Sequence, residues 1–497
     1  MASLTKPGPI LQMVADGMIA FRRQREETLR VDVWTKGAQL DHNDPAPHST
    51  TKEGWPFIPS SNNSREFDDL ASRAPAPWGK LIVSSLAQTI YMESARIKGS
   101  PEDATMESFG ILQENNWAAR QIPLTRATIG HGVAYVKALP AVSPIDGADS
   151  ALVRPVSALR MAAFYDDLDD EWPSYAIEVD DYQIDIDNKK MTFVRFYDET
   201  AVHALWFEGT GESVSDYVYA GVIMEHQLGI CPIVRFANLM DLEGRSMGEI
   251  APILPLLRRI DQDTFDRLVV QRFGAWKIRY IAGIAEPDTD EAKRAQAMVL
   301  RMQDLLIAGD PDTKFGTLDE TAVSGFIEAT DADLRVLAAV TQTPPHHLLG
   351  LSSNLQAEAL AAAEAGLQRK SLDFQIYNSG SYQQLLRLIA MIRKNTEEAS
   401  SKQIDIRYRD TESRSLVQAA QALGTLATQL KMPVEMLWGR VPGWSDEDSE
   451  RAKRLIEEGG VDQLLDAMTQ ALGVDPTQGD AAQSPAQGSD QSGQSTV

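Results

Sequence analysis

The sequence predicts an α+β chain built of several parts, and two patterns support this fold class. Between Gly132 and Val234, short runs alternate apolar with polar residues, which is typical of antiparallel strands. After Gly248, apolar residues instead follow the 3.6-residue period of helices through several long stretches. A chain of 497 residues also exceeds what one hydrophobic core usually organises, so we expect several domains or one extended subunit of several parts.

The composition is that of a folded and strongly acidic protein. Hydrophobic residues make up 43% and charged residues 24% of the chain, close to the averages for folded proteins. The 47 Lys and Arg residues face 71 Asp and Glu residues, a net charge of -24, so the molecule as a whole repels nucleic acid. This balance excludes a conventional DNA binder but permits a protein that surrounds DNA without gripping it.

Cysteine content and hydropathy indicate the compartment. The single cysteine, Cys231, excludes an intrachain disulfide and a Cys-rich zinc site, and we expect it to be a small buried hydrophobe. No apolar run approaches the roughly 20 residues of a membrane span, and the N-terminus lacks the apolar core of a secretory signal. We therefore expect no membrane partner and a protein made in the cytoplasm.

The chain before the strands is predicted to be mostly helical. Residues 1–30 carry apolar positions near one face, and a polar stretch follows through Ser64, so we expect roughly the first 60 residues to be peripheral. Helical spacing of Leu81, Leu86 and Ile90 predicts one helix over residues 78–97, and residues 117–128 predict a second.

Five runs carry the strand pattern: VAYVKALP, YAIEVDD, MTFVRFYD, AVHALWFE and YVYAGVIMEHQL. The acidic stretch DDLDDEWP, from Asp166 to Pro173, lies between two of them, where Asp and Pro are expected for backbone reasons.

Long helices dominate the second half. One is expected through Phe273, with Pro252 and Pro255 near its start because proline inside a helix costs about 3 kcal/mol. A small inserted unit follows over residues 274–325, including a helix from Asp290 to Gln303. The remaining predictions are a helix over 327–342, a Thr-Pro-Pro breaker, a long helix over 356–394 with candidate kinks at Gly366 and Gly380, a strand over 404–410, helices to 472 and a disordered tail.

No catalytic, cofactor-binding or metal-binding residue can be assigned from the motifs. A phosphate-binding loop and a Gly-x-Ser-x-Gly elbow are both absent, which disfavours an ATPase and a serine hydrolase. The pair His346–His347 has neither a Glu between its members nor a helical i, i+4 partner, so zinc chemistry is not expected. Asp166 to Glu171 could serve a metal-dependent hydrolase, but a solvated turn explains them better.

Two further features have competing interpretations. The helix after Gly248 mixes four Arg with four acidic residues, which indicates a solvated or subunit-facing helix rather than a DNA clamp. Its candidate stem residues are Arg258, Arg259, Asp261 and Asp263. The segment PPHHLLGLSSNLQ, residues 344–356, has exposed-looking apolar residues and few charges, and is compatible both with a functional loop and with a plain interhelical connection.

Taken in order, several motifs resemble those of phage portal proteins, of the branch common in actinobacterial siphophages, over roughly residues 75–470. The residues that carry the resemblance are Asn115–Pro140, Tyr165–Val179, Gly229–Asn238, Gly244–Ile284 and, most strongly, VLAAVTQTPPHHLLGLSSNLQAEALAAAEAGLQRK at Val336–Lys370. Each motif alone is weak, and together they are specific.

The resemblance implies a closed ring oligomer, a dodecamer in virions, whose subunits surround a channel. Each subunit then has an α+β wing, a two-helix stem, a small α/β clip, a long kinked spine helix and an α-helical crown. On this sequence the implied parts are a peripheral arm at 1–75, the wing at 76–243, stem helix 1 at 244–273, the clip at 274–325, stem helix 2 at 326–343, the tunnel loop at 344–356, the spine helix and wing return at 357–403, the crown at 404–472 and a disordered tail at 473–497.

The resemblance also implies which segments meet which partners. The tunnel loop that faces double-stranded DNA would comprise Pro344, Pro345, His346, His347, Leu348, Leu349, Gly350, Leu351, Ser352, Ser353 and Asn354. The clip surface, with Trp276, Lys277, Arg279 and Tyr280, would dock the terminase large subunit during packaging and the head-to-tail adaptor protein afterwards. Major capsid and scaffolding proteins are further implied partners, and no cofactor is implied.

We therefore expect a portal protein at the capsid vertex of the virion that guides the genome in packaging, retention and ejection and hydrolyses nothing itself. Two alternatives from other classes stay open: a minor capsid protein without a channel, and a metal-dependent hydrolase that uses the acidic residues 166–171.

Overall fold

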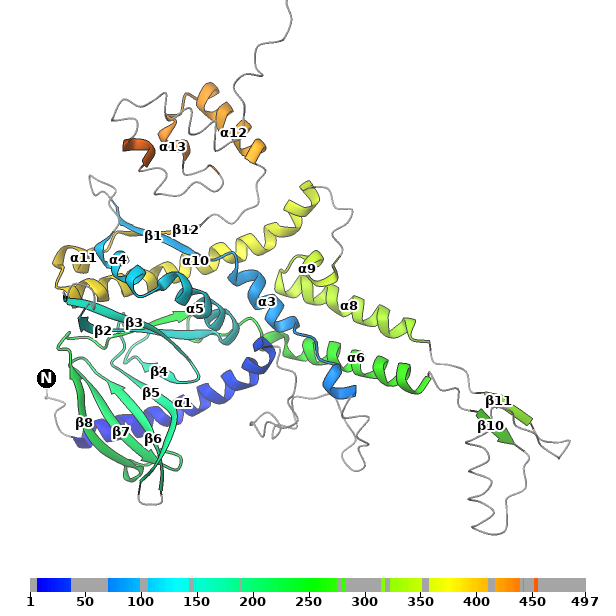
Figure 1. Ribbon diagram of the computed structural model, residues 1–497, viewed down its shortest axis with the longest axis horizontal. Coiled ribbons are helices and arrows are strands. Elements are labelled where there is room, and N and C mark those ends of the chain that lie inside the picture. The colour runs from blue at the N-terminus through cyan, green and yellow to red at the C-terminus, as the bar shows by residue number, and fades with distance from the viewer. Residues whose placement is uncertain are drawn as a thin grey trace, which may run out of the picture. The chain divides into compact units, whose positions relative to one another are not determined.

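The computed structural model describes residues 7–36, 70–98, 106–142, 147, 149–186, 189–274, 279–282, 314–317, 322–350, 357–409, 416–438, 441 and 451–454. The chain divides into two compact units, Met1–Arg409 and Asp410–Val497. The first unit combines helices with antiparallel sheets (Figure 1), so the predicted α+β class is confirmed.

The larger sheet of the first unit is an antiparallel meander of five strands, whose order β4-β5-β6-β7-β8 follows the chain. Side chains on one face of β6 and β7, among them Val194, Phe196 and Leu205, are fully buried. Four of the five predicted runs form strands here. The strands are β4 (Met161–Phe164), β5 (Tyr175–Ile186), β6 (Lys189–Tyr197), β7 (Ala201–Glu208) and β8 (Tyr217–Glu225), with the short turn η2 (Val214–Asp216) before β8.

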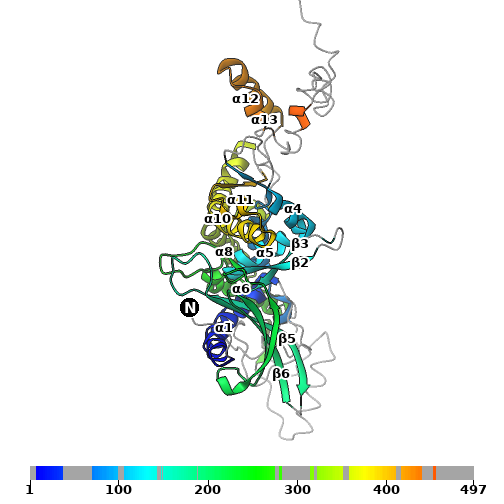
Figure 2. The same cartoon turned by 90° about the vertical axis from the view of Figure 1, so that its left-hand side faces the viewer.

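Helix α1 (Pro7–Lys36) covers one face of this sheet, as Figures 1 and 2 show from two sides. Ile10, Val14, Met18 and Phe21 lie on one stripe of the helix, each at most 1% exposed, and they share a core with the strands. The expectation of a peripheral N-terminus is therefore wrong for residues 7–36. Periodicity found the helix, but its partner lies more than 100 residues further along the chain.

A second sheet of three strands, in the order β3-β2-β9, lies under several helices. The strands are β2 (Val133–Val142), β3 (Asp149–Ser157) and β9 (Ile233–Ala237). Helices α4 (Glu107–Glu114) and α5 (Trp117–His131) contribute Leu112 and Trp117 to its core, and the predicted helix at 117–128 is thus confirmed. Strand β3 escaped the sequence pattern because Pro155 interrupts it, which an edge strand tolerates.

The single helix expected over residues 78–97 is wrong. Helix α3 (Trp78–Ala87) ends early, and β1 (Met92–Ile97) pairs antiparallel with β12 (Ile404–Tyr408), more than 300 residues away. The buried Gln121 side chain accepts from the Met92 N–H at 2.9 Å and donates to the Met92 carbonyl at 3.2 Å, which holds the start of the strand. Strand β1 meets these two partners, β12 and Gln121, only in the tertiary structure.

The second half of the first unit is mainly helical, as predicted. The turn η3 (Ala251–Ile253) and α6 (Leu254–Gly274) place Pro252 and Pro255 at the helix start, where the missing N–H costs nothing. The other elements are β10 (Arg279–Ala282), paired with β11 (Lys314–Thr317), then α8 (Ser324–Thr341), α9 (Pro345–Leu349), α10 (Ala357–Arg393) and α11 (Thr396–Ser400). The helix expected at 290–303 lies outside the described residues.

Two glycines allow the sheet region and α6 to meet. A Cβ on Gly248 would lie 2.1 Å from the carbonyl oxygen of Gly130, and Gly132 has a φ of +95°. The Glu249 N–H also donates to the Ile129 carbonyl at 2.8 Å. The backbones approach so closely here that no side chain fits at position 248.

The second unit holds α12 (Leu416–Gln429), α13 (Glu435–Trp438) and helical residues 451–454. Residues 404–409, expected to begin the crown, belong to the first unit, because β12 pairs with β1 and the second unit begins at Asp410. The tail at 473–497 falls outside the described residues. Among those described, no helix is both long and apolar enough to cross a membrane, and Cys231 is buried as predicted.

Replacing Phe21 with Ala tests whether α1 belongs to the core. Phe21 is 1% exposed, so Phe21→Ala should lower the free energy of unfolding by about 3–5 kcal/mol, as measured by urea denaturation. The control is Ile19→Ala on the same helix, at a side chain that is 55% exposed, which should change stability by less than about 0.5 kcal/mol. Equal effects of the two changes would show that α1 is peripheral.

Candidate functional site

Helices α6 and α8 form a two-helix arm, and α6 carries the candidate stem residues named from the sequence. The chain leaves the body of the unit along α6 and returns beside it along α8, with β10 and β11 at the far end (Figure 1). Leu257 and Ile260 of α6 share a core with Leu334 and Leu337 of α8, all buried. The apolar stripes predicted from the 3.6-residue period therefore face each other.

An ion pair fixes the register of this arm. The Arg259 guanidinium donates from Nε and a terminal nitrogen to the two carboxylate oxygens of Asp333, each at 2.5 Å. The Arg259 side chain is 57% exposed, so the pair adds little stability, but its two-point geometry specifies how α8 lies along α6. Arg258 and Asp263 are half-buried on the same helix.

Asp261 is buried within the subunit, whereas the sequence predicts that its helix is solvated or faces another subunit. Its side chain is only 3% exposed, and one carboxylate oxygen has no hydrogen-bond partner among the described residues. Burial raises the pKa of Asp261 to about 7, and a hydrogen bond from the Ala76 N–H lowers it only in part. This carboxyl group of α6, beside Ala76, therefore titrates near neutrality.

The first part of the expected loop at 344–356 is a helix. Pro345 opens α9 at its first position, and Gly350 ends it with a φ of +65°. Leu348 is buried in the same core as α6 and α8, so it is not free to face DNA. Leu351, Ser352, Ser353 and Asn354 lie outside the described residues.

Helix α9 places both histidines beside Glu364 of α10. Potential ligand atoms of His346, His347 and Glu364 all lie within 4.8 Å of one another. The two imidazole rings meet edge to face, with centroids 4.4 Å apart. Burial, and then the neighbouring His346, lower the pKa of His347, which favours its neutral form. The sequence search missed this group because Glu364 follows in the next helix.

The clip residues are described only in part. Trp276 and Lys277 lie outside the described residues, and Arg279 and Tyr280 belong to β10, which pairs with β11. The docking role of all four stays a prediction.

The acidic stretch at 166–171 forms a turn between β4 and β5. The Asp167 N–H donates to the Asp170 carboxylate at 2.9 Å, and Glu171 pairs with Arg387 of α10. These contacts use the carboxylates to hold the turn and to attach it to α10. They give the hydrolase alternative no support.

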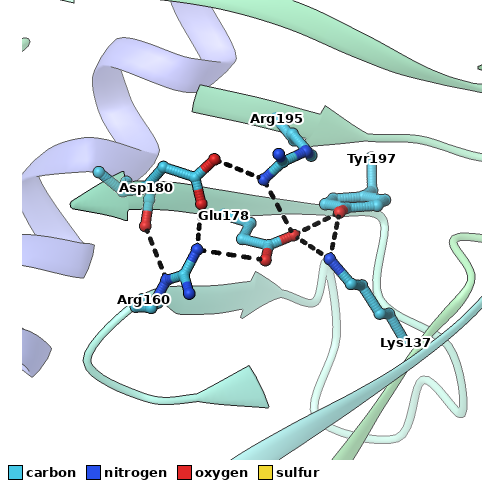
Figure 3. A network of polar contacts seen from close by, with 7 residues as sticks. Lys137, Arg160, Glu178, Asp180, Arg195 and Tyr197 are labelled. Carbon is cyan, nitrogen blue, oxygen red and sulfur yellow. Dashed lines mark hydrogen bonds and ion pairs between the residues drawn. The ribbon is translucent and has the colours of Figure 1, made fainter. Parts of the chain in front are cut away.

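A polar network centred on the buried Glu178 joins the two sheets (Figure 3). Glu178 of β5, 3% exposed, accepts from Lys137 of β2 at 2.6 Å and from the hydroxyl of Tyr197 at 2.5 Å. Arg160 and Arg195 both pair with Asp180, and each also approaches Glu178, at 4.0 and 3.8 Å. Burial, followed by the Glu178 carboxylate, raises the pKa of Tyr197, which therefore keeps its proton and donates. Sequence patterns gave no sign of this network.

Comparison with known proteins identifies the family. The family model described as phage portal protein, SPP1 Gp6-like, matches residues 46–462. The chain therefore belongs to this family of phage portal proteins, which is structural rather than catalytic, and the resemblance carried by the sequence motifs is confirmed.

Two solved structures are also similar to the chain. A chain from the neck of a native GTA particle, computed with C12 symmetry, is 14% identical over 76% of this chain and 90% of its own, with a TM-score of 0.44. A chain from the neck of an empty GTA particle, computed with C6 symmetry, is 13% identical over 75% and 92%, with a TM-score of 0.39. Among curated proteins, none matches the chain.

Asp261 predicts a pH dependence of stability. Between pH values of about 4 and 7 the unfolded chain, with a pKa near 3.8, loses this proton while the folded arm keeps it, so the free energy of unfolding falls as pH rises. Asp261→Asn should thus be more stable than the native protein above pH 7, by up to about 4 kcal/mol, and equal near pH 4. Denaturation at a series of pH values measures this.

The matched control for this prediction is Asp331→Asn, at an exposed position of α8, which should leave the pH profile unchanged. A profile of Asp261→Asn parallel to that of the native protein would contradict the assignment.

The network around Glu178 predicts a large cost of removing one buried charge. Glu178→Ala leaves the largely buried Lys137 ammonium without its carboxylate partner, while Arg160 and Arg195 keep Asp180, and it should lower the free energy of unfolding by about 3–5 kcal/mol. Glu208→Ala is the control, because it removes an ion pair of the same 2.6 Å length to Lys189 at the surface. It should leave the denaturation midpoint nearly unchanged, and equal shifts would refute the structural role.

Proposed function

We propose that this chain is the subunit of a portal ring at one vertex of a phage capsid, through whose axial channel double-stranded DNA is packaged, retained and ejected. The observation that carries the proposal is the match of the portal family model over residues 46–462. That match extends from before α3 to beyond α13, and so includes the two-helix arm and both sheets.

The elements of the structure fit the parts of such a subunit. The two sheets with α1, α4 and α5 form the wing, α6 and α8 the stem, and residues 274–325 the clip. Helix α10 is the spine, and the unit that begins at Asp410 is the crown. Residues 344–356 form the tunnel loop, which begins with α9. The clip, with Trp276, Lys277, Arg279 and Tyr280, docks the terminase large subunit and later the adaptor.

The chain's charge suits passive guidance of DNA. With a net charge of -24, a ring of these subunits offers little to hold phosphates by counterion release, so a polyanion can slide through without adhering. The energy for translocation then comes from the terminase, whose ATPase drives packaging. The portal supplies the conduit and the docking surface.

Exposed apolar residues on the stem and spine suit ring contacts. Val336 and Val340, one turn apart on α8, are 47% and 61% exposed. Leu372 and Ile376, one turn apart on α10, are 54% and 66% exposed. Apolar pairs of this kind on a soluble protein mark interaction surfaces, and in a ring the partner is the next subunit.

Electron microscopy of the purified protein tests the proposal directly. The portal assignment predicts closed rings with an axial hole, and the portal resemblance implies about a dozen subunits in each ring. Particles that stay monomeric or form open filaments at every concentration would overturn it, and a minor capsid protein without a channel would then be the better assignment.

A paired substitution tests the interface. Val336→Asp with Val340→Asp should abolish rings while leaving the subunit folded, because two charges would be buried between subunits. Size-exclusion chromatography with light scattering gives the mass, and circular dichroism gives the fold. The control is Val142→Asp at the end of β2, 66% exposed, where rings should persist. Rings in both variants would exclude this face of α8 from the interface.

A further inference from the structure

We propose that His346, His347 and Glu364 form a binding site for one divalent transition-metal ion of the zinc type, which connects α9 to α10. The proposal concerns a single subunit and does not depend on ring formation or on DNA.

The ligand set and its geometry are those of a zinc-type site. One carboxylate and two imidazoles meet with their potential ligand atoms within 4.8 Å, and no other such group of three occurs among the described residues. Two His and one Glu are a known three-ligand set for Zn²⁺, with the fourth position left to water. Small side-chain rotations would bring the ligand atoms to the roughly 2.0–2.2 Å that Zn²⁺ requires.

In the described part of the chain, the His346 imidazole lacks a hydrogen-bond partner at its buried nitrogen. Its side chain is 11% exposed, and its Nδ1 is buried without a hydrogen-bond partner among the described residues. Its Nε2 lies 3.6 Å from a Glu364 carboxylate oxygen, beyond the length of a hydrogen bond. A buried imidazole nitrogen without a partner is costly, and a metal ion bound at that nitrogen would relieve the cost.

Both helices that carry the proposed ligands are held in place by core packing. Leu348 of α9 and Leu367 of α10 are both buried in the core shared with the stem helices. Each lies within three residues of a proposed ligand, so both ends of the site are held by packing. The ion would add a cross-link between two elements that otherwise meet through apolar contacts.

The test measures Zn²⁺ binding to the full chain after treatment with EDTA. Isothermal titration calorimetry should show one tight site per chain, and Co²⁺ in its place should give a visible d–d absorption band. His347→Gln and Glu364→Gln should each weaken this site at least about a hundredfold, because even the loss of an outer-shell partner costs about 10- to 100-fold. His347 is exposed, so its replacement leaves the core intact.

Glu328→Gln, at an exposed position of α8, is the matched control and should bind Zn²⁺ as the native chain does. Zn²⁺ should also raise the melting temperature of the native chain and of Glu328→Gln, but not of the two ligand variants, since only an ion that binds the folded state stabilises it. Unchanged affinity in both ligand variants, or no tight site in the native chain, would overturn the proposal.

Discussion

Helix α10 contributes buried side chains to two separate cores of the first unit, and this double burial is the constraint on which the rest of the unit depends. Leu385, Leu386 and Ile389 pack under the three-stranded sheet, while Leu367 and Phe374 pack with α6 and α8. Each such side chain contributes about 1.5–3 kcal/mol when fully buried. One continuous helix therefore couples the sheets to the arm, and neither core is complete without it.

Polar contacts along α10 fix the position and rotation of this helix in the two cores. Lys370 donates to the Glu249 carboxylate at the base of α6 and, at 3.1 Å, to the Thr341 carbonyl at the end of α8. Further along, the Asn378 amide donates to the Ala237 carbonyl of β9 at 3.1 Å. Apolar burial alone would let the helix slide or rotate, whereas these bonds specify one position. These contacts therefore fix the orientation of α6 and α8 relative to the three-stranded sheet.

The short helix α9, which follows α8, carries both a buried and an exposed side chain. Leu348 anchors α9 in the core, while His347 on the same short helix is exposed beside Glu364. In the proposed portal this helix is the base of the tunnel loop, so a metal ion at His346, His347 and Glu364 would stiffen that base. In the network between the two sheets, the buried Glu178 carboxylate is surrounded by several partners.

Periodicity and proline placement determined much of this protein from sequence alone. They located the five runs of strand, α5, the start of α6 near Pro252 and Pro255, and α10, because local spacing and the cost of proline act within one element. Ordered motifs located the family. Only the tertiary structure decided that α1 is core, that residues 92–97 are a strand, that Asp261 is buried and that Glu364 meets the two histidines. Each of these depends on a partner far along the chain, and the spacing of residues within one segment carries no information about such a partner.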